Sequence, residues 1–123
     1  MLLNKRDIGN RYEQYAAKYL RQHGCQTVTS NFSYRNGEID LIVLDDSFVV
    51  FVEVRFRANE DFGLAAETVT LAKQRKLIRT AQHFLQQNEK YSLFDARFDV
   101  IGISQSSSSH ETRVDWIKGA FTT

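Results

Sequence analysis

The chain of 123 residues has no proline, a single cysteine and almost no net charge. Without proline, the ends of helices and strands must be marked by glycine, asparagine, serine and aspartate. The one cysteine, Cys25, excludes an internal disulfide and fits a reducing compartment. Sixteen basic residues stand against fifteen acidic ones, so only the local distribution of charge can argue for a polyanionic partner.

Long apolar runs are also absent from the sequence. None approaches the roughly 20 residues that a transmembrane helix needs, and residues 1–7 lack the apolar core of a signal peptide. We therefore expect no membrane partner and a cytoplasmic location. An apolar share of 42% argues against disorder, and residues 1–123 are expected to form a single domain with a substantial core.

Hydrophobic periodicity predicts two helices and five strands. The order is α-β-β-β-α-β-β, an α/β fold in which a mixed central β-sheet is flanked by helices. Gly24 is the expected cap at the end of the first helix, and Leu71 belongs to the apolar stripe of the second. The helices are expected over residues 4–22 and 65–88, and the strands over 28–34, 38–44, 48–56, 97–103 and 113–117.

The second and third strands form a predicted hairpin that carries two carboxylates. With a two-residue turn at positions 46–47, the register places Asp40 opposite Glu53, and opposed residues share a sheet face with Cβ atoms roughly 5 Å apart. Arg55 projects from the same face as Glu53. Two close carboxylates repel each other, and a divalent cation relieves that repulsion.

Two interpretations of this hairpin stay open on the residues alone. In one, Asp40 and Glu53 hold Mg²⁺ or Mn²⁺ for phosphodiester hydrolysis. In the other, which the pattern by itself favours, the hairpin has an ordinary polar face on which Glu38 pairs with Arg55 across the strands.

Further polar residues have similar pairs of interpretations. Glu13 is either aimed at Asp40 by close approach of the first helix to the sheet or is an exposed helical acid. Gln74 either hydrogen-bonds a ligand or lies in solvent at the edge of the apolar stripe. Asp99 is either an acid behind the site or, as we favour, a structural hydrogen-bond acceptor. A basic cluster on the second helix could form a phosphate-binding rim with Arg55 and Arg57, or a solvated face: Lys73, Arg75, Lys76 and Arg79.

Taken in order, these motifs resemble the restriction-endonuclease-like nucleases with the PD-(D/E)xK motif. More narrowly, the chain resembles the small YraN-type bacterial family, a relative of the Holliday-junction resolvases. The resemblance covers nearly the whole chain, and the ordered set is more specific than any one motif. It rests on Gly9, Glu13 and Ala16, on residues 37–42 and 51–55, on Phe62, Gly63 and Lys73, on residues 97–100, and on Ala120 and Phe121.

The resemblance implies a restriction-endonuclease-like fold and hydrolysis of DNA, branched or structured DNA included. Asp40 and Glu53 would bind Mg²⁺ or Mn²⁺, the Val54 carbonyl could add an oxygen, and Glu13 would be the additional acid from the helix. From the basic cluster itself, we predict that nucleic acid is held by Lys73, Lys76, Arg79 and Arg57. Resolvase relatives pair two active sites in a homodimer, and no feature of this sequence decides between homodimer and monomer.

The chain departs from the motif at Arg55, which stands where the motif has lysine. Arginine remains protonated and cannot take a proton from water, although it can hold a phosphate. The sequence therefore leaves two alternatives to a nuclease: a non-catalytic nucleic-acid-binding module on the same fold, or an interaction scaffold.

Overall fold

The computed structural model describes residues 5–57, 68–106, 109 and 111–122, without the side chains of residues 5–9 and 57. The expected order α-β-β-β-α-β-β is confirmed, and a 3₁₀ turn, η3, precedes the fourth strand. The elements are α1 (Lys5–Gln22), β1 (Gln26–Tyr34), β2 (Gly37–Asp45), β3 (Phe48–Arg57), α2 (Leu71–Gln87), η3 (Glu89–Tyr91), β4 (Asp95–Gln105) and β5 (Thr112–Phe121).

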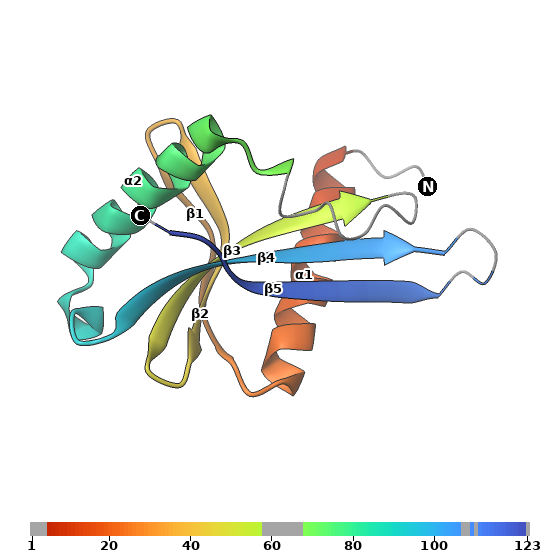
Figure 1. The fold of residues 1–123 in the computed structure, drawn as a ribbon, viewed down its shortest axis with the longest axis horizontal. Helices are drawn as coiled ribbons and strands as arrows, with labels where there is room; N and C mark the ends of the chain where they lie inside the picture. The colour runs from red at the N-terminus through yellow and green to blue at the C-terminus, as the bar shows by residue number, and fades with distance from the viewer. Residues whose placement is uncertain (1–4, 58–67, 107–108, 110, 123) are drawn as a thin grey trace.

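One mixed five-stranded sheet has the order β1-β2-β3-β4-β5 (Figure 1). Only the β3–β4 pair is parallel, and α2 belongs to the crossover between these two strands. The predicted hairpin is confirmed: β2 and β3 are antiparallel, and Asp45 faces Phe48 in the expected register. The apolar runs of β2 and β3 lie inside the sheet, as their burial on both faces requires.

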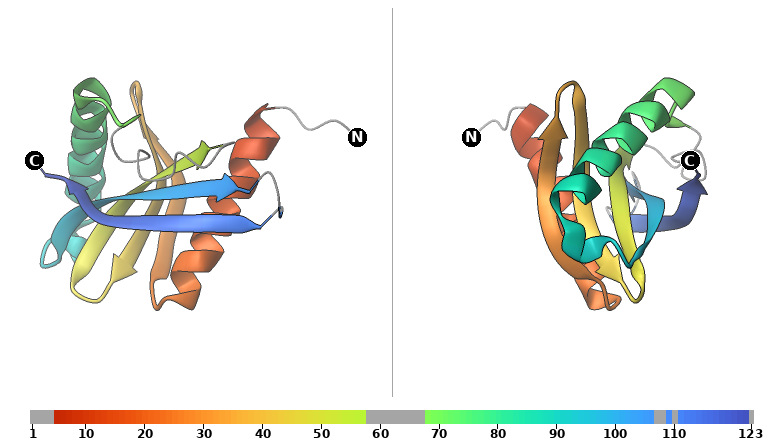
Figure 2. Two further views of the ribbon diagram at one scale, coloured as in Figure 1. Left: turned by 45° about the vertical axis from the view of Figure 1, so that its right-hand side comes forward. Right: turned by 90° about the vertical axis from the view of Figure 1, so that its left-hand side faces the viewer.

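The two helices cover opposite faces of this sheet (Figures 1 and 2). Beneath α1, Leu20 packs with Val50 and its neighbours, and beneath α2, Phe84 packs with Phe51. Successive residues of a strand point to opposite faces, so β3 contributes alternately to both clusters. Each helix is held on the sheet by an apolar stripe. Burial of each large side chain in such a stripe stabilises the fold by roughly 1.5–3 kcal/mol.

The start of α2 corrects the sequence-based expectation. Residues 65–67 lie outside the described residues, and the helix begins at Leu71 because Thr70 is its N-cap, whose hydroxyl accepts the N–H of Lys73. Leu71 is 68% exposed and does not belong to the apolar stripe, since the first helical turn extends beyond the sheet-facing surface. Gly24, with a φ of 92°, ends α1 as expected.

The turn between β1 and β2 packs tightly against α2. Gly37 begins β2 at this point, and an added Cβ would overlap the hydroxyl of Thr80, which donates to the Lys76 carbonyl. We expect Gly37→Ala to lower the free energy of unfolding by about 1–3 kcal/mol, because the core would be overpacked. In a Thr80→Ala background the same change is expected to cost less in urea unfolding. An equal cost in both backgrounds would contradict this account.

Candidate active site

Strand β2 changes its pleat at Asp40. Ile39 packs in the cluster beneath α2, whereas Leu41 packs beneath α1, although residues two apart on a regular strand share a face. Between the described strands β1 and β2, Ser30 pairs with Leu41 and Phe32 pairs with Ile39, but Asn31 and Asp40, which lie between these pairs, are not paired. Asn31 has a φ of 54°, in the left-handed region that asparagine tolerates. The irregularity reorients the Asp40 side chain.

The carboxylate of Asp40 takes the place of a backbone pair with β3. The regular β2–β3 ladder ends at Leu41 and Val52, and beyond it the N–H of Val54 donates to Asp40 Oδ2 at 2.8 Å. Asp40 and Glu53 are therefore not a simple opposed pair, but their side chains still meet in a hydrogen bond. The predicted proximity of these two carboxylates is present, and its geometry differs from that of a flat hairpin.

Glu53 is the most confined of these acids, with 5% of its surface exposed. Its Oε2 lies 3.5 Å from Arg55 Nη2 and 3.4 Å from Lys73 Nζ. These separations exceed ordinary hydrogen-bond lengths, and among the described residues this buried oxygen has no hydrogen-bond partner. The cations therefore supply charge and leave a lone pair available.

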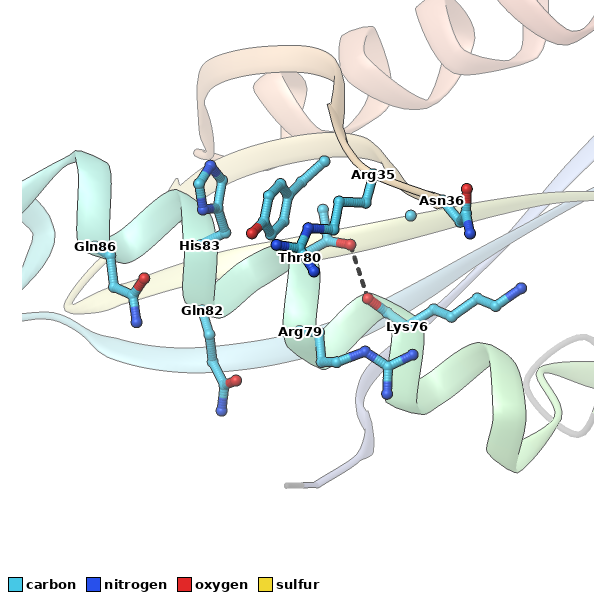
Figure 3. Close-up of a pocket in the computed structure, with 10 residues that line it drawn as sticks. Arg35, Asn36, Lys76, Arg79, Thr80, Gln82, His83 and Gln86 are labelled. Atoms are coloured by element: carbon cyan, nitrogen blue, oxygen red, sulfur yellow. Dashed lines mark hydrogen bonds between the residues drawn. The ribbon is translucent and has the colours of Figure 1, made fainter.

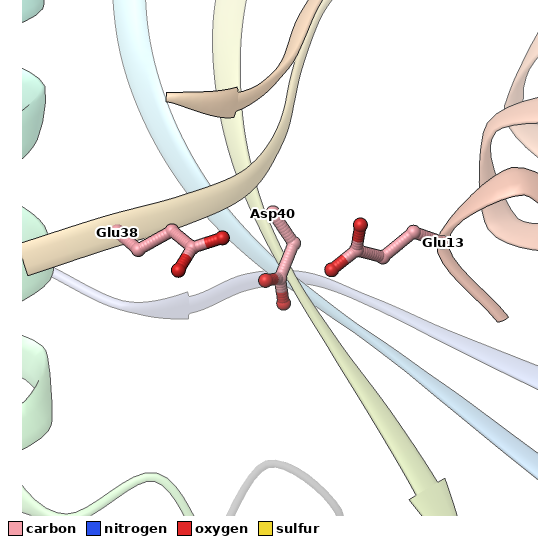
Figure 4. A group of neighbouring side chains, drawn as sticks. All are labelled: Glu13, Glu38 and Asp40. Carbon is pink, nitrogen blue, oxygen red and sulfur yellow. The ribbon is translucent and has the colours of Figure 1, made fainter. Parts of the chain in front are cut away.

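Two further carboxylates converge on Asp40. Oxygen atoms of Glu13, Glu38 and Asp40 all lie within 4.8 Å of one another. Figure 4 shows Glu13, from α1, and Glu38, from β2, directed toward Asp40 from either side. The side chain of Asn31, on β1, interacts with Glu13 and opposes the rise in the pKa of that carboxyl. We call Glu13, Glu38, Asp40 and Glu53 the carboxylate group.

Crowding and burial make ionisation of the carboxylate group costly. Desolvation raises the pKa of Glu53 to about 8, helped by its hydrogen bond with Asp40 and by repulsion from that carboxylate, and opposed by Lys73 and Arg55. Desolvation is also the first cause that raises the pKa of Asp40 and that of Glu13. Near neutral pH the protein therefore holds Glu53 largely protonated, as a donor to Asp40.

Arg55 faces the carboxylate group and has one hydrogen-bond donor without a partner among the described residues. Its Nε is buried and, within the part of the chain that the structure describes, has no hydrogen-bond partner. The ion pair with Glu53 corrects the alternative in which Glu38 pairs with Arg55, because Glu38 joins the other carboxylates instead. A buried guanidinium donor beside buried acids is suited to an anionic ligand such as a phosphate.

The predicted nucleic-acid-binding residues lie at two neighbouring places. Lys73 reaches Glu53, but Lys76 and Arg79 line a separate groove along α2. The side chain of Arg57 lies outside the described residues, as do Phe62 and Gly63 of the family motifs. Gln74 neither points at the carboxylates nor lies in open solvent: its amide donates to the Val69 carbonyl at 3.0 Å and secures the start of α2.

Sequence reasoning missed two members of the site, Glu38 and Asn31. Glu38 lies two positions before Asp40 on the same strand, a spacing that places side chains on one face and could have identified it. Asn31 is positioned by its positive φ, for which the sequence offers no signal beyond the tolerance of asparagine for that conformation.

Asp99 is a structural acceptor and stands apart from the carboxylate group, as the favoured interpretation expected. It is 1% exposed and accepts from Arg97 Nε at 2.9 Å, from Trp116 Nε1 at 2.9 Å and from the Gly119 N–H at 3.0 Å. These bonds secure β5 on β4 at the irregularity in their pairing near Val100.

No helix among the described residues is long and apolar enough to cross a membrane. A family model described as "Uncharacterised protein family UPF0102" matches residues 12–103, a range that includes the whole carboxylate group.

Individual relatives match over nearly their full lengths. A UPF0102 protein of Vibrio parahaemolyticus is 46% identical over 121 residues, covering 98% of this chain and 97% of the relative. A UPF0102 protein of Coxiella burnetii is 43% identical over 113 residues, covering 92% and 90%. One from Ectopseudomonas mendocina is 44% identical over 115 residues, covering 94% of each. The chain therefore belongs to the UPF0102 family.

Proposed function

We propose that this protein is a metal-dependent nuclease that hydrolyses phosphodiester bonds in DNA, branched or structured DNA included. The observation that carries the proposal is the carboxylate group itself, in which Glu53 keeps a buried oxygen without a hydrogen-bond partner next to two cations. Metal-dependent phosphodiester hydrolysis uses acids to hold the metal, and fixed cations can stabilise the charge that develops on the phosphate.

The donor atoms of the carboxylate group fit Mg²⁺ or Mn²⁺. All of them are carboxylate oxygens, the ligands that such hard cations prefer. Asp40 and Glu53 would hold the ion, because Glu53 offers its unpartnered Oε2, and Glu13 would assist from α1. When bound, the ion would lower the pKa of a water molecule and neutralise charge on the phosphate.

Arg55 and Lys73 would orient the scissile phosphate. The Arg55 side chain is 30% exposed, so its guanidinium can donate to a phosphate oxygen while it pairs with Glu53. Lys73 lies equally near Glu53 and, unlike arginine, is able to lose a proton. The side chain of Lys73 thus offers one chemical property of the motif lysine that Arg55 lacks.

The fold agrees with this proposal. A five-stranded mixed sheet with one helix on each face, and with the acids at an irregularity between α1 and β3, supports a restriction-endonuclease-like class and kinship with the PD-(D/E)xK nucleases. We place the protein in the cytoplasm, where DNA is its substrate and where Cys25 stays a buried free thiol.

One observation favours a second candidate, a nucleic-acid-binding module that does not cut. Arg55 cannot act as a base, and a site that only holds phosphate needs no base. The two functions differ in whether a divalent cation is required for the effect of the protein on DNA.

Cleavage of DNA by the purified protein tests the proposal. With Mg²⁺ or Mn²⁺ we expect cleavage of a synthetic four-way junction, no cleavage in chelator, and loss of activity to background in Asp40→Asn, because the amide removes a metal-ligand charge. Asp46→Asn, at an exposed acid in the β2–β3 turn, is the matched control and should retain activity.

The variant Arg55→Lys separates the two candidate functions. If Arg55 holds phosphate in a nuclease, lysine should preserve or raise cleavage, since it keeps the charge and can lose a proton. Metal-independent DNA binding by the wild-type protein, with no cleavage by either form, would instead establish the binding module.

A further inference from the structure

A groove of about 450 Å³ is lined by the β1–β2 turn and by α2 where the two meet, beside the carboxylate group but not part of it. Figure 3 shows Arg35 reaching from the turn over Thr80, while Lys76, Arg79 and His83 come from α2. The volume falls in the range of small-ligand sites, roughly 300–1,000 Å³. A hollow of this size admits one nucleotide, whereas a double helix would only lie across its mouth.

The charge of the groove has one sign. Arg35, Lys76 and Arg79 line it, and none of its ten described lining residues is acidic. Within the described part of the chain, no ion pair neutralises these three cations, although four other basic side chains are so paired. In a chain of net charge +1, this is a local concentration of positive charge that attracts phosphate.

Flat side chains adjoin the cations. The rings of Tyr34 and His83 stack with centroids 3.5 Å apart and planes 8° apart, and the Arg35 guanidinium lies 5.2 Å from the Tyr34 centroid. Aromatic and guanidinium planes are the surfaces on which unstacked bases bind. The side-chain amides of Asn36, Gln82 and Gln86 also line the groove and can pair with base edges.

The groove is continuous with the carboxylate group along the chain. Gly37, in the groove wall, immediately precedes Glu38 of the carboxylate group. On α2, Lys76 follows Lys73 by about one helical turn, and Lys73 lies 3.4 Å from Glu53. A DNA strand that runs from the carboxylate group along α2 would therefore place its next phosphates in the groove.

We propose that this groove binds the phosphate and base of an unpaired nucleotide, so that the preferred DNA has a single-stranded segment next to the cleaved bond. Cleavage next to that segment rests on the proposed function, whereas binding in the groove does not depend on cleavage. Cations hold the phosphate, and the exposed Arg35 guanidinium plane, which the Tyr34–His83 stack supports, holds the base together with the amides.

Binding is measured in chelator by fluorescence anisotropy, with a labelled blunt duplex and the same duplex extended by a short single strand. We expect the extended duplex to bind about tenfold more tightly, the gain expected from stacking one base. For this probe, Lys76→Ala/Arg79→Ala is expected to reduce the slope of log affinity against log salt by about 1.4, since two cations are removed. His83→Ala should lose the preference for the extension, and His83→Phe should keep it.

Arg75→Ala is the matched control, because Arg75 is an exposed cation of the same helix that does not line the groove. Melting temperatures identify any variant that fails to fold, and Arg79→Ala alone then replaces the double variant. Equal affinity for blunt and extended duplexes, an equal loss in Arg75→Ala and Arg79→Ala, or equally tight binding of polyglutamate would each overturn the proposal. Absence of cleavage in metal would overturn only the proposed nuclease function.

Discussion

Glu53→Gln is expected to abolish divalent-metal binding and, at the same time, to raise the melting temperature of the metal-free protein above pH 7. Both effects have one cause. Glu53 is buried beside Asp40, so its ionised form is costly without a cation, whereas the amide is uncharged and can still donate to Asp40 as the protonated acid does. A metal ion binds the ionised carboxylate, and the uncharged amide lacks the negative charge that attracts the ion.

The pH dependence of stability follows from the raised pKa of Glu53, which is about 8 in the folded protein against an ordinary value of 4.5. Between these pH values the folded state keeps a proton that the unfolded state has lost, so stability falls as pH rises, by up to about 1.4 kcal/mol per pH unit for this group. The contribution is fully present below pH 4.5 and lost above pH 8. In Glu53→Gln this part of the slope should be absent.

The measurement is thermal unfolding of both proteins from pH 5 to 9, with Mg²⁺, with Mn²⁺ and with chelator. The wild-type protein should gain several degrees from either metal, most at high pH, because binding displaces the proton of Glu53. Glu89→Gln, at an exposed acid of η3, is the control and should behave as wild type. A wild-type protein that ignores both metals, together with a variant strongly destabilised in chelator, would refute the metal site.

The fold was predictable because its signals are local. Near-continuous apolar runs indicated the inner strands β2 and β3, a two-residue turn set their register, and Gly24 marked the end of α1. The start of α2 was placed too early, because the periodic pattern does not show where the helix leaves the sheet-facing surface. The cap at Thr70 decides that boundary, and Thr68, two residues earlier, is a second candidate for the role in the sequence.

The site was predictable in its residues and not in its geometry. Asp40 and Glu53 are conspicuous as acids within apolar strands, and the predicted hairpin register placed them opposite each other. Their contact instead depends on the irregularity opposite Asn31, a long-range property of three strands and α1. The groove was not foreseen either, because the β1–β2 turn contributes Arg35 and no pattern along one helix reveals a cation supplied by a distant turn.

Asp99→Asn is expected to lower the free energy of unfolding by about 3–5 kcal/mol, whereas Glu53→Gln is expected to raise it in the metal-free protein. Asp99 faces only donors: Arg97, Trp116 and the Gly119 N–H. An asparagine amide turned toward any of them sets donor against donor and leaves the Arg97 charge, 15% exposed at its side chain, with only Asp45 as a partner.

Urea unfolding of Asp99→Asn and of Asp95→Asn measures this difference. Asp95 begins the same strand with an exposed side chain, so its substitution should change stability by no more than about 0.5 kcal/mol. A small effect at Asp99 would show that Arg97 is compensated by Asp45 alone, and would remove the electrostatic reason for the attachment of β5. Taken together, the two acids separate the roles of buried charge in this chain. Asp99 is satisfied by the donors around it and contributes to stability, whereas Glu53 is left with an unused oxygen, lowers stability when ionised and is therefore available to a ligand.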